Sequence, residues 1–294
     1  MSVSFGIKTT QVNTSYSDVL RVWQEADDLE VFESAWLWDH LVPMRGEVTA
    51  PALEAWTLLS ALAAVTNRLR LGVIVTSNRI RPPAVLAKMA ATVDQISDGR
   101  LIFGIGAGYA RTADPALTAV AEREYEAYGI DVVPVREAID ALGEALTITK
   151  RLWTESAPFD FEGAHYRLTG AICEPKPVAH LPILIGAGGE KRSLRLVAEH
   201  ADIWNCPTRG DVDEFRRKSA ILDEHCRAIG RDSVDIDRQV QILVPSDPGQ
   251  APAATDQIKA LIDAGATQII LAPLPPWPER IAARLAENIL ARLD

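Results

Sequence analysis

The stretch from residue 71 to residue 109 constrains the fold more than any other part of the sequence, because it contains a complete strand–loop–helix–strand unit. Residues 71–75 form an apolar, β-branched run, which is typical of a strand buried on both faces of a parallel sheet. Apolar residues recur at helical spacing after Pro82 and Pro83, and residues 101–105 form a second apolar strand. This pattern predicts two parallel strands joined by a helix.

Short apolar strands and longer amphipathic helices alternate along the rest of the chain. The expected strands lie at residues 3–8, 34–38, 71–75, 101–105, 182–185, 201–205, 239–244 and 267–271. Eight strand–helix units in 294 residues predict an α/β fold, a TIM (β/α)8 barrel that forms a single domain over residues 1–294. Two insertions are expected, at residues 110–129 after strand four and as a hairpin over residues 159–168 before strand five.

A doubly wound open sheet is the alternative architecture. Such a sheet usually has a glycine-rich turn after its first strand, whereas here the first strand runs into the sequence KTTQVNTS. The barrel is therefore favoured.

Composition and charge restrict the partners. The net charge of −10 argues against a nucleic-acid ligand, because neutralising phosphates needs a basic surface. No apolar run is long enough to cross a membrane, and the first residues lack the apolar core of a signal peptide. The three cysteines, Cys173, Cys206 and Cys226, fit reduced thiols, and no metal-ligand spacing is present. We expect a cytoplasmic protein without a metal that acts on a small molecule.

Asp39 and His40 directly follow the second strand, at the rim where TIM barrels bind their ligands. A histidine there can exchange a proton near neutral pH, and a neighbouring carboxylate can orient a ring or a ligand. His40 is therefore a candidate acid or base. A histidine that merely bonds a loop carbonyl is the alternative.

Glycines follow the fourth and fifth strands. Gly186-Ala187-Gly188-Gly189 precedes a helix, so its bare N–H groups could bind a phosphate, with charge added by Lys191 and Arg192. A tight turn is the alternative, although it explains one or two glycines better than three in four. For Gly106-Ala107-Gly108, contact with a flat ring and simple backbone packing are equally good explanations.

The loop after the third strand is cationic and rich in hydroxyl groups. Arg79 and Arg81 could bind a phosphate or a carboxylate, or could be solvated. Trp38 and Trp204 lie near strand ends, where a cofactor could contact them, although tryptophan is more often a core residue. Glu124, in the first insertion, is expected to be a solvated helix charge.

Together these segments resemble the luciferase-like flavin and deazaflavin oxidoreductases, above all the branch that depends on coenzyme F420, an 8-hydroxy-5-deazaflavin. The matching segments are WLWDHL, the run from residue 53 to residue 109, EYEAYGI, RLWTESAPFDFEGAHYRL, CEPKP and PILIGAGGEKRSLRLVAEHADIWN. They cover most of residues 36–205, and beyond residue 205 only the barrel pattern matches.

The resemblance implies an enzyme that transfers a hydride between the deazaflavin and a small organic substrate. It implies a bulge with a non-prolyl cis peptide near Ile74 and Val75, behind the central ring of the cofactor. His40 would be the active-site histidine, and residues 186–189 would hold the phosphate of the cofactor tail. The ring and its polyol chain would be lined by Asp39, Thr76, Asn78, Gly106, Ala107 and Gly108.

Two positions depart from the pattern of the sugar-phosphate dehydrogenases in this family. Tyr109 stands where some of them place an acid, and Met44 stands where they place a tryptophan. The proton donor is thus open between His40 and Tyr109. An FMN-dependent monooxygenase on the same fold is the first alternative function, and a non-catalytic ligand-binding barrel is the second. The resemblance also implies a homodimer, with residues 53–62 and 84–93 as apolar candidates for its interface.

Overall fold

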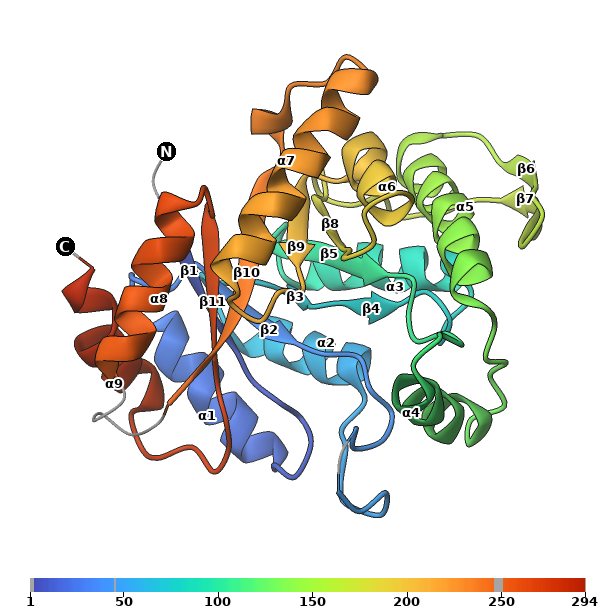
Figure 1. Cartoon of the computed structure of the whole chain (residues 1–294). Helices are drawn as coiled ribbons and strands as arrows, with labels where there is room; N and C mark the ends of the chain where they lie inside the picture. Colours follow the sequence, from blue (N-terminus) through green and yellow to red (C-terminus); the bar gives the residue numbers. More distant parts are fainter. Residues whose placement is uncertain (1–2, 45, 246–250, 294) are drawn as a thin grey trace.

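Eight parallel strands close into a barrel in the computed structural model, which describes residues 3–44, 46–245 and 251–293 (Figure 1). β3 pairs with both β2 and β5, and β1 pairs with β11, so no edge of the sheet stays open. The predicted TIM barrel is confirmed. The barrel strands are β1 (Ser4–Lys8), β2 (Ser34–Leu37), β3 (Arg70–Val73), β5 (Leu101–Gly106), β8 (Ile183–Gly186), β9 (Ile203–Cys206), β10 (Asp237–Val244) and β11 (Gln268–Pro273).

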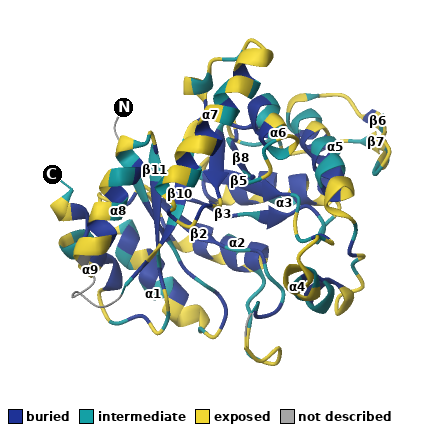
Figure 2. Cartoon of the chain, in the orientation of Figure 1, coloured by how far each residue is buried: buried dark blue, intermediate teal, exposed yellow. Residues whose placement is uncertain are grey.

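Helices cover the outside of the barrel, with their apolar faces on the strands and their polar faces in solvent (Figure 2). Among the described residues, no helix combines the length and the apolar character needed to cross a membrane. The outer helices are α1 (Tyr16–Asp27), α2 (Ala55–Val65), α3 (Pro83–Ile96), α5 (Val135–Thr154), α6 (Ser193–His200), α7 (Val212–Ala228), α8 (Ala251–Asp263) and α9 (Ile281–Asn288), with short 3-10 turns at Ser233–Asp235 and Leu290–Arg292.

The third barrel strand is interrupted where the sequence predicts a continuous run over residues 71–75. β3 ends at Val73, and the peptide bond between Ile74 and Val75 is cis although neither residue is proline. The chain then resumes as β4 (Thr76–Ser77), which pairs with the end of β5. The bulge and its non-prolyl cis bond are therefore where the family resemblance implies, and the unbroken strand is wrong.

Both predicted insertions are present. The segment after β5 contains the helix α4 (Pro115–Glu126), which begins with a proline after the N-cap residue Asp114. The segment before β8 contains the antiparallel hairpin β6 (Phe159–Glu162) and β7 (Arg167–Ala171). Both insertions lie outside the ring of barrel helices (Figure 1).

The interior of the barrel is apolar at mid-height and polar above that level. A small cluster fills the middle of the barrel, and it consists of Trp36, Ile74, Ile102, Leu184, Ile203 and Ile270. Amide side chains and Lys8 lie on the inner faces of β1, β9 and β10, toward the carboxyl ends of these strands. The barrel is therefore a closed core with a polar mouth, which is where TIM-barrel enzymes bind their substrates.

Candidate active site

The bulge at Ile74 and Val75 projects a valine toward two glycines. A Cβ atom on Gly106 would lie 2.8 Å from a methyl group of Val75, and a Cβ atom on Gly186 would lie 2.8 Å from the other methyl group. Larger residues at these two positions would displace the valine. Gly186 lies within β8 rather than in the turn that follows. Glycine is needed there to make room for Val75, whether or not a phosphate binds at the turn. The bulge and these glycines form an apolar surface, which we call the platform.

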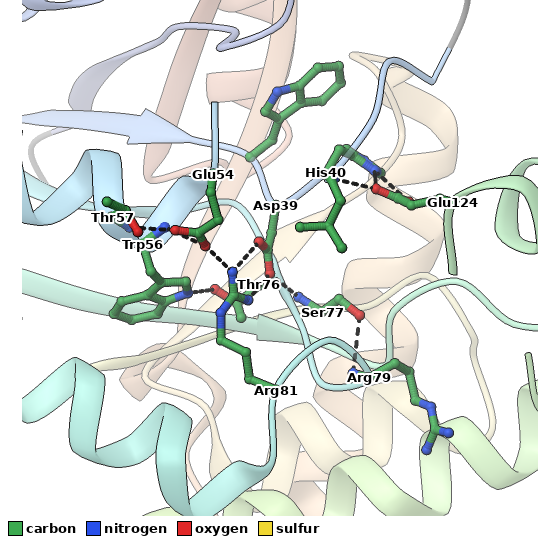
Figure 3. Close-up of polar contacts among 12 residues, drawn as sticks. Asp39, His40, Glu54, Trp56, Thr57, Thr76, Ser77, Arg79, Arg81 and Glu124 are labelled. Atoms are coloured by element: carbon green, nitrogen blue, oxygen red, sulfur yellow. Dashed lines mark hydrogen bonds and ion pairs between the residues drawn. The ribbon is translucent and has the colours of Figure 1, made fainter. Parts of the chain in front are cut away.

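Asp39 is bonded to the loop that follows the platform, through Ser77 and Arg81 (Figure 3). Its carboxylate accepts two hydrogen bonds from Arg81, at 2.8 and 3.0 Å, and one from the backbone N–H of Ser77. Burial raises the pKa of Asp39, and the guanidinium of Arg81 opposes that rise. Arg81 also pairs with Glu54, the N-cap residue of α2. Asp39 and Arg81 therefore fix the loop after the bulge. Arg81 already has two carboxylate partners, Asp39 and Glu54.

The loop after the bulge contains two candidate residues, Thr76 and Asn78, and only Asn78 has a side-chain atom left for a ligand. Thr76 is fully buried, and its hydroxyl accepts a hydrogen bond from Trp56, so it is turned toward α2. Asn78 is also buried, and its amide donates to the hydroxyl of Tyr166 in the hairpin. Its side-chain oxygen has no hydrogen-bond partner among the described residues. A buried acceptor of this kind is suited to a ligand N–H group.

His40 is held by a carboxylate that sequence reasoning assigned to solvent. Nδ1 of His40 lies 3.1 Å from the carboxylate of Glu124, which is 2% exposed and also accepts from the backbone N–H of Leu41 (Figure 3). The expectation that Glu124 is a solvated helix charge is therefore wrong. Since a carboxylate accepts, the proton of a neutral ring is on Nδ1, and Nε2 is the atom that can exchange a proton with a substrate.

Tyr109 lies beside this histidine, with 5.3 Å between the two ring centroids. Its backbone N–H donates to the hydroxyl of Tyr125, which also shares a hydrogen bond with Ser77. Burial raises the pKa of Tyr125 to about 12, so this phenol stays neutral and links α4 to β4 and to the loop after β5. Gly108 has a φ of +79°, and a Cβ atom there would lie 2.7 Å from the Tyr125 hydroxyl. Both facts require glycine at the turn.

The ring of Trp38 lies between His40 and Lys8 at the end of β1. The Trp38 ring packs edge-on against His40 with 4.8 Å between centroids, and Nζ of Lys8 lies 5.5 Å from the Trp38 centroid. The amide of Gln11 donates to the backbone carbonyl of Trp38 and accepts from its backbone N–H, which fixes the position of Trp38. The indole N–H of Trp38 is buried and has no acceptor among the described residues. Trp204, by contrast, bonds the carbonyl of Ala187 and belongs to the core.

The glycine turn after β8 contacts a lysine from another element. Around the position of a Cβ atom on Gly188, Pro207 lies at 3.0 Å and Nζ of Lys218 in α7 at 3.3 Å. In the described part of the chain, the N–H groups of Gly188 and Gly189 have no acceptor. Lys218 is buried and pairs with Glu214 at 2.7 Å. The turn therefore combines bare N–H groups with a cation, as an anion site requires.

Lys191 and Arg192, which the sequence analysis assigned to this turn, face the outside of the barrel. Arg192 forms an ion pair with Asp140 of α5 at 2.7 Å. Lys191 and Arg192 line an open hollow of about 500 Å³ between α5 and α6, on the outside of the barrel. Its charged side chains are mostly paired with one another, so this hollow lacks the chemistry of the mouth.

A model of the family described as luciferase-like monooxygenase matches residues 2–291. The chain belongs to the luciferase-like monooxygenase family. Pyrimidine monooxygenase RutA from Allorhizobium ampelinum is 33% identical over 186 residues, which are 62% of this chain and 47% of that protein. F420-dependent glucose-6-phosphate dehydrogenase from Kineococcus radiotolerans is 33% identical over 223 residues, which are 74% of this chain and 62% of that protein. The chain thus spans less than two thirds of the length of either relative.

Solved structures share the fold. An F420-dependent secondary alcohol dehydrogenase in complex with an F420-acetone adduct superposes with a TM-score of 0.85 at 20% identity, and each chain is covered in full. The match of the family model confirms the luciferase-like family expected from the sequence.

Three residues of this luciferase-like barrel escaped sequence reasoning: Lys8, Glu124 and Lys218. Lys8 shares its strand face with Gly6, so strand alternation could have shown that it points inward. Glu124 belongs to the EYEAYGI segment that carries part of the family resemblance, which was the available signal. For Lys218, an ordinary position within a charged helix, the sequence offers no signal.

Proposed function

We propose that this chain is an oxidoreductase that transfers a hydride between coenzyme F420 and a small organic substrate. The F420-dependent dehydrogenase relative supports this proposal, since it matches three quarters of the chain. The observation that carries the proposal is the packing of Val75 against Gly106 and Gly186 after β3, together with the pairing of Glu124 with His40, which follows the neighbouring strand β2. A platform can back a flat ring while the histidine serves the reacting substrate on the open side.

The side chains in the mouth fit such a cofactor. Val75 offers an apolar surface, and the unpartnered oxygen of Asn78 can accept from an N–H group at the edge of a ring. The bare N–H groups of Gly188 and Gly189, with Lys218 nearby, fit an anionic tail. When bound, the deazaflavin supplies the carbon that accepts or donates the hydride.

The protein's own part in the reaction is to position the substrate and to move a proton. Nε2 of His40 accepts a proton when an alcohol is oxidised, or donates one when a double bond is reduced. Glu124 holds the ring through Nδ1 and favours the imidazolium that forms when Nε2 takes a proton. Trp38 and Tyr109 flank the histidine and keep water from it.

An FMN-dependent monooxygenase is the second candidate, favoured by the similarity to pyrimidine monooxygenase RutA. Titration of the purified chain with F420 and with FMN, in oxidised and reduced forms and followed by absorbance, separates the two. We expect F420 to bind and FMN to bind far more weakly. Tight FMN binding without F420 binding would replace the proposal by the monooxygenase.

A further inference from the structure

The mouth of the barrel contains a half-buried lysine, Lys8, whose ammonium group has no carboxylate partner among the described residues. Nζ of Lys8, at the end of β1, donates a hydrogen bond to the side-chain oxygen of Gln241 in β10 at 2.7 Å. No aspartate or glutamate of the described chain forms an ion pair with it. An ammonium has three N–H donors, and a cation partly withdrawn from water is costly unless anions or acceptors surround it. This favours a bound anion as the missing partner.

The lysine is directed toward the mouth because the space beneath it is full. Gly6 precedes Lys8 on the same face of β1, and a Cβ atom there would collide with Ser34 and with Ile270. Leu243 lies two residues beyond Gln241 on the same face of β10, and it is 63% exposed at the top of the barrel. An exposed leucine therefore lies above the glutamine that accepts from Lys8.

The position of Lys8 relative to the histidine defines what can bind. Trp38 lies between them, in contact with the His40 ring on one side and beneath the ammonium on the other. A ligand that reaches both groups must span about one indole ring. Its anion would contact Lys8 while its reacting carbon lies near Nε2 of His40.

We propose that Lys8 and Gln241 bind the carboxylate of a small substrate whose apolar body packs on Trp38 and Leu243. A carboxylate fits better than a phosphate, since no second cation among the described residues contacts Lys8, Gln241 or Trp38. The location of the reacting carbon rests on the proposed function, whereas the anion site does not depend on it.

The test measures the binding of small carboxylates and of their uncharged amides to the full chain, with and without F420, by calorimetry. The probes are acetate, butyrate, benzoate and cyclohexanecarboxylate, each with its amide. The variants are Lys8→Met and Gln241→Leu, and the control is Lys259→Met, which removes an exposed lysine from the outer helix α8. Absorbance titration with F420 is run on each variant.

We expect at least one carboxylate to bind the native chain about tenfold more tightly than its amide. Lys8→Met should abolish this preference, Gln241→Leu should reduce it, and Lys259→Met should retain it. The anion site is overturned if no carboxylate is preferred over its amide, or if Lys8→Met retains the preference. It is also overturned if Lys8→Met removes F420 binding, because Lys8 would then belong to the cofactor site. If the preference depends on Lys8 but F420 does not bind, the anion site stands and the proposed function fails.

Discussion

At the scale of single residues, the charge of Lys8 that would bind an anion also lowers the stability of the folded chain. Burial lowers the pKa of Lys8 from its ordinary 10.5 to about 8. Below pH 8 the lysine is charged in both the folded and the unfolded chain, and the folded state bears the full cost of burying the charge. Between pH 8 and 10.5 the folded chain loses the proton first, so its stability rises with pH.

Lys8→Met should therefore stabilise the chain at pH 7, because methionine is of similar length and has no charge to bury. We expect a gain of roughly 1 to 3 kcal/mol that disappears as the pH rises toward 10.5. Urea unfolding at pH 7 and at pH 10 measures both values, with Lys259→Met as the unchanged control. A variant that is less stable than the native chain at pH 7 would contradict the assignment of Lys8 as a partly buried cation.

Glu124 acts through His40, which makes it a positioning residue. Glu124→Gln retains the shape of the side chain but removes its charge, so it should lower kcat about 10- to 100-fold while F420 affinity changes little. Nitrogen NMR of His40 should show the ring proton on Nδ1 in the native chain and a mixture of tautomers in the variant. Glu126→Gln, an exposed neighbour in α4, is the control. An unchanged tautomer together with unchanged kcat would remove Glu124 from the mechanism.

At the scale of elements, the interrupted strand β3–β4 depends on glycines in its neighbours. Gly186→Ala places a methyl group against the stiff side chain of Val75, so the platform must move and F420 affinity should fall about tenfold or more. The double variant Gly186→Ala, Val75→Ala should recover much of that affinity, because the smaller side chain makes room. If the single variant binds F420 as well as the native chain does, the ring does not rest on Val75.

The insertion helix α4 is joined to the barrel by the hydroxyl of Tyr125. Tyr125→Phe leaves the backbone N–H of Tyr109 and the hydroxyl of Ser77 without this partner, which should cost about 1 to 3 kcal/mol of unfolding free energy. Hydrogen exchange should also become faster in residues 107–114. Tyr128→Phe removes a hydroxyl whose hydrogen bond to the carbonyl of Leu41 is long, at 3.3 Å, and exposed to solvent, so it should change the stability by less than about 0.5 kcal/mol. Equal losses in both variants would contradict the link.

Local sequence patterns account for the elements far better than for the contacts between them. The spacing of apolar residues predicts the eight strands and both insertions, because burial repeats with the period of each element. The family resemblance implies that Asp39 and Thr76 line the cofactor, and the local pattern leaves Arg81 open between an anion and solvent. In the structure Asp39 pairs with Arg81, and Thr76 accepts a hydrogen bond from Trp56. Which partner a polar residue chooses depends on elements that are distant in the sequence, and no local pattern records that choice.

At the scale of the whole molecule, closure of the barrel brings together the residues that define the site. Lys8 and Gln241 are 233 positions apart, and His40 and Glu124 are 84 positions apart. Each pair joins a strand end to an element that only the closed barrel or its insertion places nearby. The platform, the histidine and the lysine therefore occupy successive positions around one mouth, which fits a ring and a substrate bound side by side.

A crystal structure of the chain with F420 tests the central claim most directly. We predict that the flat ring lies on Val75 between Gly106 and Gly186, with its open face toward Nε2 of His40 and its phosphate at the turn of Gly188 and Gly189. A ring bound away from the platform, or one whose reactive face is turned from His40, would contradict the proposed function.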